Sequence, residues 1–412
     1  MTLDPVHVDG ITDLVRSIGR EVDDSEHDDI AERIWENFLD PLYDDATTPV
    51  LEPLDEIRRG AVATGDIAVI DPPFPTSHGI DAGTLNPTTF RNGVVMDIAQ
   101  AAIGRVPTDI DRHRSRSIVA TIHTGDATVA FRDEWVRYDE GTSRRRIFRA
   151  PDVDRYAEAV VHALALYRAE VAHAHWHLDH VDDVLFLDGP IYPKGILRWE
   201  DHHPSLKRQL SDAVLPRSIV TRYLRLIENC IESGRPLVGF VKNPRSKLIT
   251  RTLRENDVGI RPPWSEDGTF FSRILGGDAG THRLRFTNWF VSHGGTDGTF
   301  AGRADPLGVQ RRLDSSAYAV AFFIVFDPRD RLVYRVETPH GIATDPERRE
   351  RIRRHVLMEV AARRGPPEAI EKADELARIS LDEKEAIRRR IETEWDSEVA
   401  GTYNERRWGL EV

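Results

Sequence analysis

Two short apolar runs, each preceded by a long helical stretch, constrain the fold of this chain most. Residues 184–188 read VLFLD and are followed by Gly-Pro, and residues 236–244 read PLVGFVKNP. Runs of this length, rich in branched apolar residues and bounded by turn residues, are typical of strands buried on both faces. The stretches before them, 152–180 and 205–233, carry apolar residues at helical spacing. Strands that alternate with helices in this way predict an α/β protein.

The rest of the chain adds strands before these runs and helices after them. We expect strands over 93–104 and 117–126, because both are rich in β-branched residues and bounded by turns. His78–Thr84 reads as a tight turn, and Asp152 or Asp154 as the cap of the long helix. The sequence predicts a hairpin over 317–339, turning at 327–330, and helices over 345–363 and 366–398, the second opened by Pro366-Pro367. Residues 1–62 read as helical and acidic, and 257–313 carry no clear pattern.

Composition limits what the chain can be. Its 412 residues include 69 acidic and 56 basic side chains, for a net charge of −13. Cys230 is the only cysteine, which excludes an internal disulfide and a cysteine-rich zinc site. No apolar run reaches the ~18 residues of a membrane span, and the N-terminus lacks the pattern of a signal peptide, so we expect a soluble, cytoplasmic protein.

The basic residues are almost all arginine: Lys occurs six times and Arg 50 times. Many acids with few lysines indicate a salt-loving or GC-rich source. In that setting the net charge reflects the solvent, and it does not exclude a nucleic-acid substrate.

Four acidic residues stand where a metal site could form. Asp81 follows a short apolar stretch, Asp188 ends a predicted buried strand, Glu170 lies on the preceding helix, and Asp374 lies on a C-terminal helix. Phosphodiester hydrolysis with divalent cations needs oxygen ligands gathered from several elements, and strand ends and covering helices are suitable platforms. An acid after the first strand, one on a helix, one after a later strand and one on a late helix follow the order of an RNase H-like nuclease site.

Each of these acids also has an ordinary structural reading. Asp81 and Asp188 stand beside turn residues, where Asp is common. Glu170 competes with Glu158 for the helical position, and most helical Glu residues face solvent. Asp374 could belong to a solvated helix face together with Glu371 and Glu375. Taken singly, none of the four positions identifies a catalytic site.

Four segments together resemble the NurA family of archaeal DNA-repair nucleases. They are GIDAGT (79–84), VLFLDGPIYP (184–193), VGFVKNPRSK (238–247) and YRVETP (334–339), and the resemblance runs from about residue 70 to the C-terminal helices. It implies an RNase H-like mixed sheet core flanked by helices, a homodimer, and Mn²⁺- or Mg²⁺-dependent cleavage of DNA. It also implies a partner, the hexameric ATPase HerA, with which such nucleases resect 5′ ends at double-strand breaks and cut single strands.

The resemblance assigns four metal-binding and catalytic positions. By position, the first family Asp falls on Asp81, the Asp of the LDG motif on Asp188, and the preceding helical Glu on Glu170, 18 residues upstream. The family usually carries Tyr-Pro and then Ala-His on a late helix, where this chain has Pro366 and Asp374. Asp is a competent ligand for Mg²⁺ or Mn²⁺, so Asp374 stays a candidate, with loss of activity as the competing reading. The hypothesis is that Asp81 and Asp188 bind a shared ion, that Glu170 binds or orients a second ion, and that Asp374 completes the site or positions water.

The same resemblance divides the chain into three parts. These are a helical N-terminal region (1–70), the RNase H-like nuclease core (71–345) and C-terminal helices that complete the site (346–412). Two other functions stay open: an adaptor that binds HerA with a decayed active site, and an RNase H-fold nuclease that acts on RNA or branched DNA.

Several basic, histidine and aromatic residues are weaker candidates. Lys242, Arg245 and Lys247 follow a strand and are expected to contact backbone phosphates. The run Arg144–Arg146 and the arginines of 348–354 are more typical of a solvated face. His173 and His177 share a helical face but lack a matching motif, and we expect a surface helix end without metal there. His340 is a minor site candidate. The aromatic residues expected mainly in the core, with base stacking as the alternative, are Trp264, Phe270, Phe271, Trp289 and Phe290.

Overall fold

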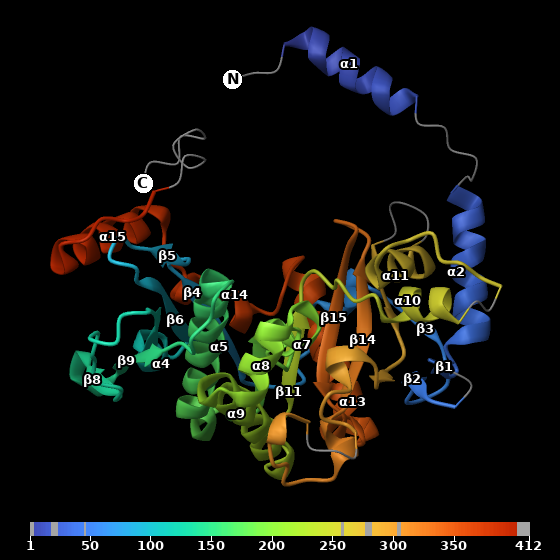
Figure 1. The fold of residues 1–412 in the computed structure, drawn as a ribbon. Helices are drawn as coiled ribbons and strands as arrows, with labels where there is room; N and C mark the ends of the chain where they lie inside the picture. The colour runs from blue at the N-terminus through green and yellow to red at the C-terminus, as the bar shows by residue number, and fades with distance from the viewer. Residues whose placement is uncertain are drawn as a thin grey trace.

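The computed structural model describes residues 4–17, 24–44, 47–256, 259–276, 282–302 and 306–401. Within these residues, one mixed sheet of 15 strands runs through the molecule, with helices on both faces (Figure 1). The strands are β1 (Leu42–Tyr43), β2 (Pro49–Pro53), β3 (Arg59–Ala63), β4 (Ser77–Thr84), β5 (Thr88–Thr89), β6 (Val95–Val106), β7 (Arg116–His123), β8 (Val136–Tyr138), β9 (Ser143–Arg149), β10 (Val184–Asp188), β11 (Leu237–Val241), β12 (Arg283–Thr287), β13 (Phe290–Ser292), β14 (Val320–Asp327) and β15 (Leu332–Pro339).

The helices lie before, between and after these strands in the sequence. They are α1 (Pro5–Arg16), α2 (Asp24–Phe38), α3 (Thr64–Ile67), α4 (Ile110–Arg114), α5 (Ala157–His177), α6 (Lys194–Leu197), α7 (Trp199–His202), α8 (Pro204–Asp212), α9 (Val214–Glu232), α10 (Leu248–Glu255), α11 (Asp267–Leu275), α12 (His340–Ala343), α13 (Pro346–Arg363), α14 (Glu368–Ala377) and α15 (Leu381–Trp395). None of the helices in the described ranges is long and apolar enough to cross a membrane.

The centre of the sheet has the strand order β7-β6-β4-β10-β11. The first three strands form an antiparallel meander, and β10 and β11 then add parallel to β4. Parallel neighbours need long crossover connections, which α5 supplies before β10 and α9 supplies between β10 and β11. The predicted mixed α/β architecture is confirmed, and the order of these five strands is compatible with an RNase H-like core.

The segment His78–Thr84 is not a turn, so that prediction is wrong. It forms most of β4, a central strand between β6 and β10. Its glycines serve close packing: a Cβ at Gly79 would lie 2.2 Å from the carbonyl oxygen of Ala369, and one at Gly83 would lie 2.4 Å from that of Ala377. The absent side chains therefore let the backbone of α14 lie directly on the strand.

The two faces of β4 meet different helices. Because side chains alternate along a strand, Asp81 lies on the same face as Gly79 and Gly83, the face that α14 covers. Ala82 points to the other face, where it packs in a cluster with Ala165 and Ala169 of α5. The sheet thus separates α5 from α14 (Figure 1).

Helix boundaries differ from expectation in two places. The expected helix 366–398 is two helices, because Ser380 begins α15 with a capping box that it forms with Glu383. The long helix α5 begins after Tyr156, which has a φ of 65° and gives no side-chain cap, so neither Asp152 nor Asp154 caps it.

The N-terminal region is helical only as far as Phe38. Residues 42–63 then form β1, β2 and β3, which pair with β13 and β12 at the far end of the same sheet. These strands are two to five residues long, too short for a periodic pattern to reveal.

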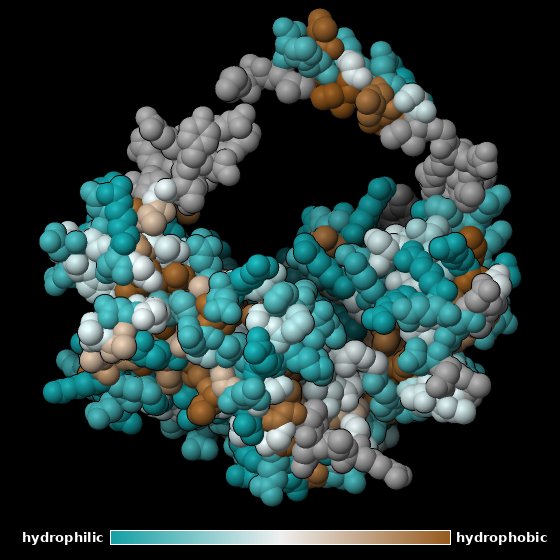
Figure 2. Space-filling model, viewed as in Figure 1, coloured by the Kyte–Doolittle hydropathy of each residue, from teal (hydrophilic) through white to brown (hydrophobic). Residues whose placement is uncertain are grey.

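Helix α1 lies apart from the rest of the molecule, and it exposes apolar side chains that show as brown spheres in Figure 2. These side chains are Val6, Val8, Ile11, Leu14 and Val15.

The aromatic residues of the unassigned region belong to the core, as expected. Each of them exposes less than a tenth of its surface: Trp264, Phe270, Phe271, Trp289 and Phe290.

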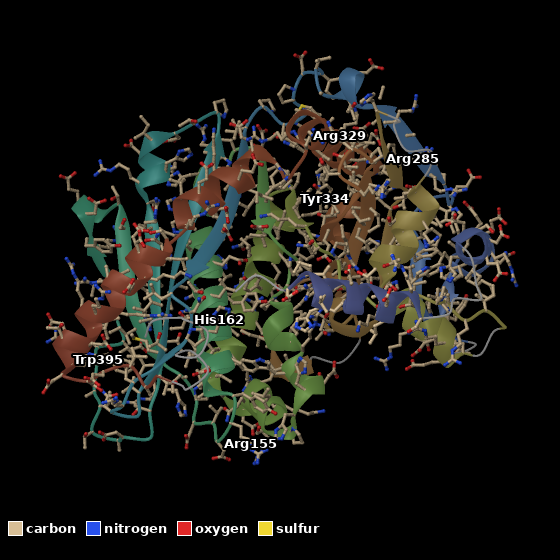
Figure 3. The ribbon with its side chains drawn as sticks, turned by 90° about the horizontal axis from the view of Figure 1, so that it is seen from above. Arg155, His162, Arg285, Arg329, Tyr334 and Trp395 are labelled. Carbon is tan, nitrogen blue, oxygen red and sulfur yellow. The ribbon has the colours of Figure 1, made fainter. Side chains whose placement is uncertain are left out.

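The view from above shows how far the sheet extends. Trp395 of α15 and Arg285 of β12 lie toward opposite ends of the sheet, with His162 of α5 between them (Figure 3).

Candidate metal centre

Three carboxylates meet on the face of the sheet that α14 covers, where the central strands β4 and β10 lie side by side. One oxygen of each of Asp81, Asp188 and Asp374 lies within 4.8 Å of the other two, and all three side chains are half-buried. Asp81 belongs to β4, Asp188 ends the parallel neighbour β10, and Asp374 lies on α14. Leu187 pairs with Ile80, so alternation directs both Asp81 and Asp188 to the face that α14 covers. Three distant segments of the sequence therefore bring like charges to one point.

Burial and the nearby like charges raise the pKa values of these carboxyl groups. Burial, reinforced by the negative charge of Asp188, raises the pKa of Asp81 to about 7. Burial also raises the pKa of Asp188, although a hydrogen bond from Lys242 opposes that shift. The Lys242 Nζ lies 2.7 Å from Asp188 Oδ2. A basic residue that was expected to contact phosphate thus lies inside the site, as the counter-charge of one carboxylate.

Asp374 reaches the cluster despite the departure of its helix from the family pattern. Its carboxylate forms an ion pair of 2.7 Å with Arg378, one turn later on the chain. Arg378 is mostly exposed, so this pair is weak and can open at little cost. The structure therefore places the Asp374 carboxylate beside those of Asp81 and Asp188.

Glu170 approaches the same edge from the other face of the sheet. It is buried on α5, and its Oε1 accepts a hydrogen bond of 2.7 Å from the Tyr223 hydroxyl. Burial raises the pKa of Glu170 to about 8, and the charges of Asp81 and Asp188 add to the rise. Glu170 is not one of the three grouped carboxylates, so its part in a metal site stays a prediction. Tyr223 was not a candidate from sequence, because a single Tyr on an apolar helix face carries no motif.

The turn after Asp188 is tied to β15 by buried charges that the sequence did not reveal. Lys194 lies 2.8 Å from Glu337 and 2.7 Å from Asp297, and Arg335 pairs with both acids. Glu337 also accepts from the backbone N–H of Ile191, which holds the LDGP turn in place. The YRVETP segment therefore supports the site through Arg335 and Glu337.

A cavity of about 550 Å³ opens beside this network. Arg245 and the exposed Arg198 lie on its wall, together with Lys194 and Asn243. Lys247 is exposed and occupies the N-cap position of α10, where its side chain forms no capping hydrogen bond. The cavity therefore combines basic side chains with the loop that follows β11.

The histidines of α5 are not at a surface helix end, so that prediction is wrong. His173 and His177 are buried, and they share hydrogen bonds of 3.0 Å with Ser117 and 2.8 Å with Ser115. Burial lowers the pKa of His177 to about 3, and that of His173 falls as well. Both are neutral packing residues under β7. His340, in turn, contacts the carbonyl oxygen of Ser316 at 3.1 Å and is not one of the grouped ligands.

Carboxylates gathered from two parallel strands and a covering helix define a class of α/β protein that can hold hard divalent cations. The family model described as NurA domain matches residues 75–379. The chain belongs to the NurA family, whose solved members include a nuclease. Among curated proteins, no sequence matches this chain.

Solved structures show similarity at low identity. The NurA nuclease from Sulfolobus solfataricus is 13% identical, with 82% of this chain and 86% of that chain covered and a TM-score of 0.45. A second NurA structure is 10% identical, with 96% and 98% covered and a TM-score of 0.48. A NurA bound to dAMP and manganese is 11% identical, with 76% and 87% covered and a TM-score of 0.42. The family assignment rests on the matched residues 75–379 and not on these superpositions.

Proposed function

We propose that this protein is a metal-dependent nuclease that hydrolyses phosphodiester bonds of DNA. The observation that carries the proposal is the meeting of Asp81, Asp188 and Asp374 within 4.8 Å at the edge of the central strands. Membership of the NurA family supports the same reaction. The three acids come from three separate elements of the fold. Such a grouping is less easily explained by chance than a pair of neighbouring carboxylates on the surface.

The chemistry of the donor set fits Mg²⁺ or Mn²⁺. Hard divalent cations take oxygen ligands, and the three acids supply only oxygen. Burial, and after it the negative charge of Asp188, raises the pKa of Asp81, and among the described residues Lys242 and Arg378 form ion pairs with the two neighbouring acids. A bound cation would polarise the phosphoryl group and lower the pKa of attacking water.

The protein's own residues hold and orient the reactants in this proposal. Asp81, Asp188 and Asp374 would bind the cation, and Glu170, fixed by Tyr223, would bind a second ion or orient water. Lys242 can exchange Asp188 for a phosphate oxygen once the cation takes over that carboxylate. Arg245 and Lys247 extend the basic surface along which the strand backbone would lie.

We further propose that the enzyme degrades DNA from 5′ ends, cuts single strands, and acts as a homodimer with the HerA ATPase in resecting double-strand breaks. Family membership supports these finer assignments. They go beyond the geometry of one chain, and each needs its own assay.

Labelled substrates test the proposal directly. Single-stranded and duplex DNA, labelled at the 5′ or the 3′ end, and an RNA of the same sequence would be incubated with Mn²⁺, with and without HerA. We expect DNA cleavage, with mononucleotides released from a 5′ label. Cleavage of RNA in preference to DNA would overturn the choice of substrate. No cleavage under any condition, together with stable HerA binding, would instead identify an adaptor.

The matched variants are Asp374→Asn and Glu375→Gln. Glu375 is exposed on the same helix, beside Asp374 but outside the cluster, so its substitution removes one negative charge from α14 without removing a proposed ligand. We expect loss of cleavage for Asp374→Asn alone. Equal losses for both variants would show that the helix charge, and not the ligand, matters.

A further inference from the structure

A second charged cavity lies on the α5 face of the sheet, away from the carboxylates. It measures about 490 Å³ and opens between β9, α5 and the start of α9. Its charged lining consists of Arg146, Arg149, Arg168, Arg222 and one acid, Asp133. In a chain with a net charge of −13, four guanidinium groups around one carboxylate are a marked local excess of positive charge.

The decisive residue is Arg168. Its side chain is only 4% exposed, and its Nε and Nη1 are buried without a hydrogen-bond partner. Among the described residues, no carboxylate forms an ion pair with it. A buried guanidinium left in this state destabilises the folded protein unless something compensates its charge. Its guanidinium carbon lies 4.8 Å from the centre of the Phe148 ring.

The neighbouring arginines increase this cost. Arg146 lies on the same Phe148 ring at 4.5 Å, and its Nε pairs at 2.6 Å with Asp133, which is itself largely exposed. No side-chain partner is recorded for Arg222 in the described ranges, and its charge repels Arg168. Burial, together with Arg222 and Arg146, lowers the pKa of Arg168 to about 9, so it remains charged at neutral pH.

The start of α9 adds a partial positive charge. Ala213 precedes this helix of 19 residues and offers no side-chain hydrogen bond to the free N–H groups of its first turn. Ala213, Val214, Leu215 and Ser218 also line the cavity. Guanidinium groups and a helix N-terminus therefore face the same space, and both favour anions.

We propose that this cavity is a binding site for a phosphomonoester. Its dianion would accept hydrogen bonds from the guanidinium groups of Arg168 and Arg222, which line the cavity, and it would neutralise the excess charge. A phosphodiester carries one charge and two substituents, and it satisfies this site less well. Val214 and Leu215 form an apolar part of the cavity wall, against which the organic part of the ligand would pack. A free nucleotide and the phosphorylated end of a strand carry the same group.

This site does not depend on the nuclease proposal. Arg168 and Glu170 are two residues apart on α5, yet Arg168 faces β9 while Glu170 faces Tyr223. A phosphate that binds in EDTA, with no divalent cation present, cannot occupy the carboxylate centre through a metal. Failure of one proposal therefore leaves the other standing.

Binding of inorganic phosphate to the full chain in EDTA, at constant ionic strength set by NaCl, tests the site by calorimetry. We expect saturable binding to wild type, weakened about tenfold to a hundredfold by Arg168→Met and by Arg222→Gln. Arg222 is half-buried at the cavity edge, so its variant decides the matter if Arg168→Met fails to fold. The matched control is Arg33→Gln, an exposed arginine on α2 at the other end of the sheet, which should leave affinity unchanged.

Further ligands identify the source of the phosphate. Thymidine monophosphate that binds more tightly than phosphate would indicate a free nucleotide. An oligonucleotide that needs its 5′-phosphate for Arg222-dependent binding would indicate a strand end. Absence of phosphate binding in wild type, or equal binding by both cavity variants and wild type, would overturn the proposal.

Discussion

The carboxylate centre and the arginine cavity are built alike but carry opposite charge. Each gathers like charges from a strand and a helix, and the two lie on opposite faces of one sheet. In the first, Lys242 and Arg378 partly compensate three acids, and in the second Asp133 partly compensates several arginines. Both arrangements cost folding free energy. The comparison shows that the sign of the uncompensated charge indicates the ligand: a cation at the carboxylate centre and an anion in the arginine cavity.

Removing the acid on α14 should have the largest effect. If Asp374 is a metal ligand, Asp374→Ala should lower the cleavage rate on the order of a thousandfold, because a missing ligand weakens metal-assisted catalysis by several kcal/mol. Asp374→His restores the usual family residue and should retain much more activity. Initial rates with Mn²⁺ would measure both. Equal activity of wild type and Asp374→Ala would remove this residue from the centre.

Neutralising a buried acid should stabilise the metal-free protein. The pKa of Asp81 rises from 3.8 to about 7 on folding, so its penalty is absent below pH 4, grows as the pH rises, and is complete above pH 7. In EDTA at pH 8, Asp81→Asn should therefore raise the free energy of unfolding by about 3 kcal/mol, and by less at pH 5. Urea denaturation at the two pH values would test this. A destabilised variant at pH 8 would contradict the repulsion.

Metal binding at the carboxylate centre should strengthen with pH. Asp81 and Glu170 hold protons near pH 7, since their pKa values are about 7 and about 8, and a cation must displace those protons. We expect the Mn²⁺ affinity to rise about tenfold or more between pH 6 and pH 8. Calorimetry in two buffers of different ionisation enthalpy would also detect the released protons. An affinity that does not change with pH would mean that these acids are already ionised.

Removing the buried charge of the arginine cavity should change the free energy of unfolding only slightly, and by the same amount at every pH near neutrality. Arg168 stays charged below its pKa of about 9, so Arg168→Met in phosphate-free buffer should change stability equally at pH 6 and pH 8. Loss of an unpaired buried charge offsets the loss of packing on Phe148, and we expect a gain of roughly 1 kcal/mol. Denaturation curves at both pH values would measure it. A loss above about 2 kcal/mol would indicate an internal partner for Arg168.

The sequence predicted the features that local patterns or family motifs reveal. The buried strands at 184–188 and 237–241 and the hairpin at 320–339 follow from local apolar patterns, which are visible in one dimension. Asp81, Glu170 and Asp188 were candidates because of a family resemblance. Asp374 was a candidate despite a departure from that family, because its spacing on the helix was retained, and the structure groups it with Asp81 and Asp188 but not with Glu170.

What the sequence could not predict came from long-range packing. Gly79 and Gly83 read as turn residues, although their purpose is the close approach of α14, some 290 residues later. His173 and His177 read as a solvated helix end because nothing local shows that β7 covers them. The arginine cavity was not predicted, because the run Arg144–Arg146 was interpreted as a solvated face and Arg168 and Arg222 are scattered among 50 arginines.

One assay tests the central claim, that the grouped carboxylates bind the cation that drives DNA cleavage. A 5′-labelled single strand would be incubated with Mn²⁺, Mg²⁺ or EDTA, with wild type and Asp188→Ala side by side, at low and high salt. We predict cleavage with either metal, none in EDTA, and none with Asp188→Ala. Cleavage that survives Asp188→Ala, or that persists in EDTA, would contradict the account.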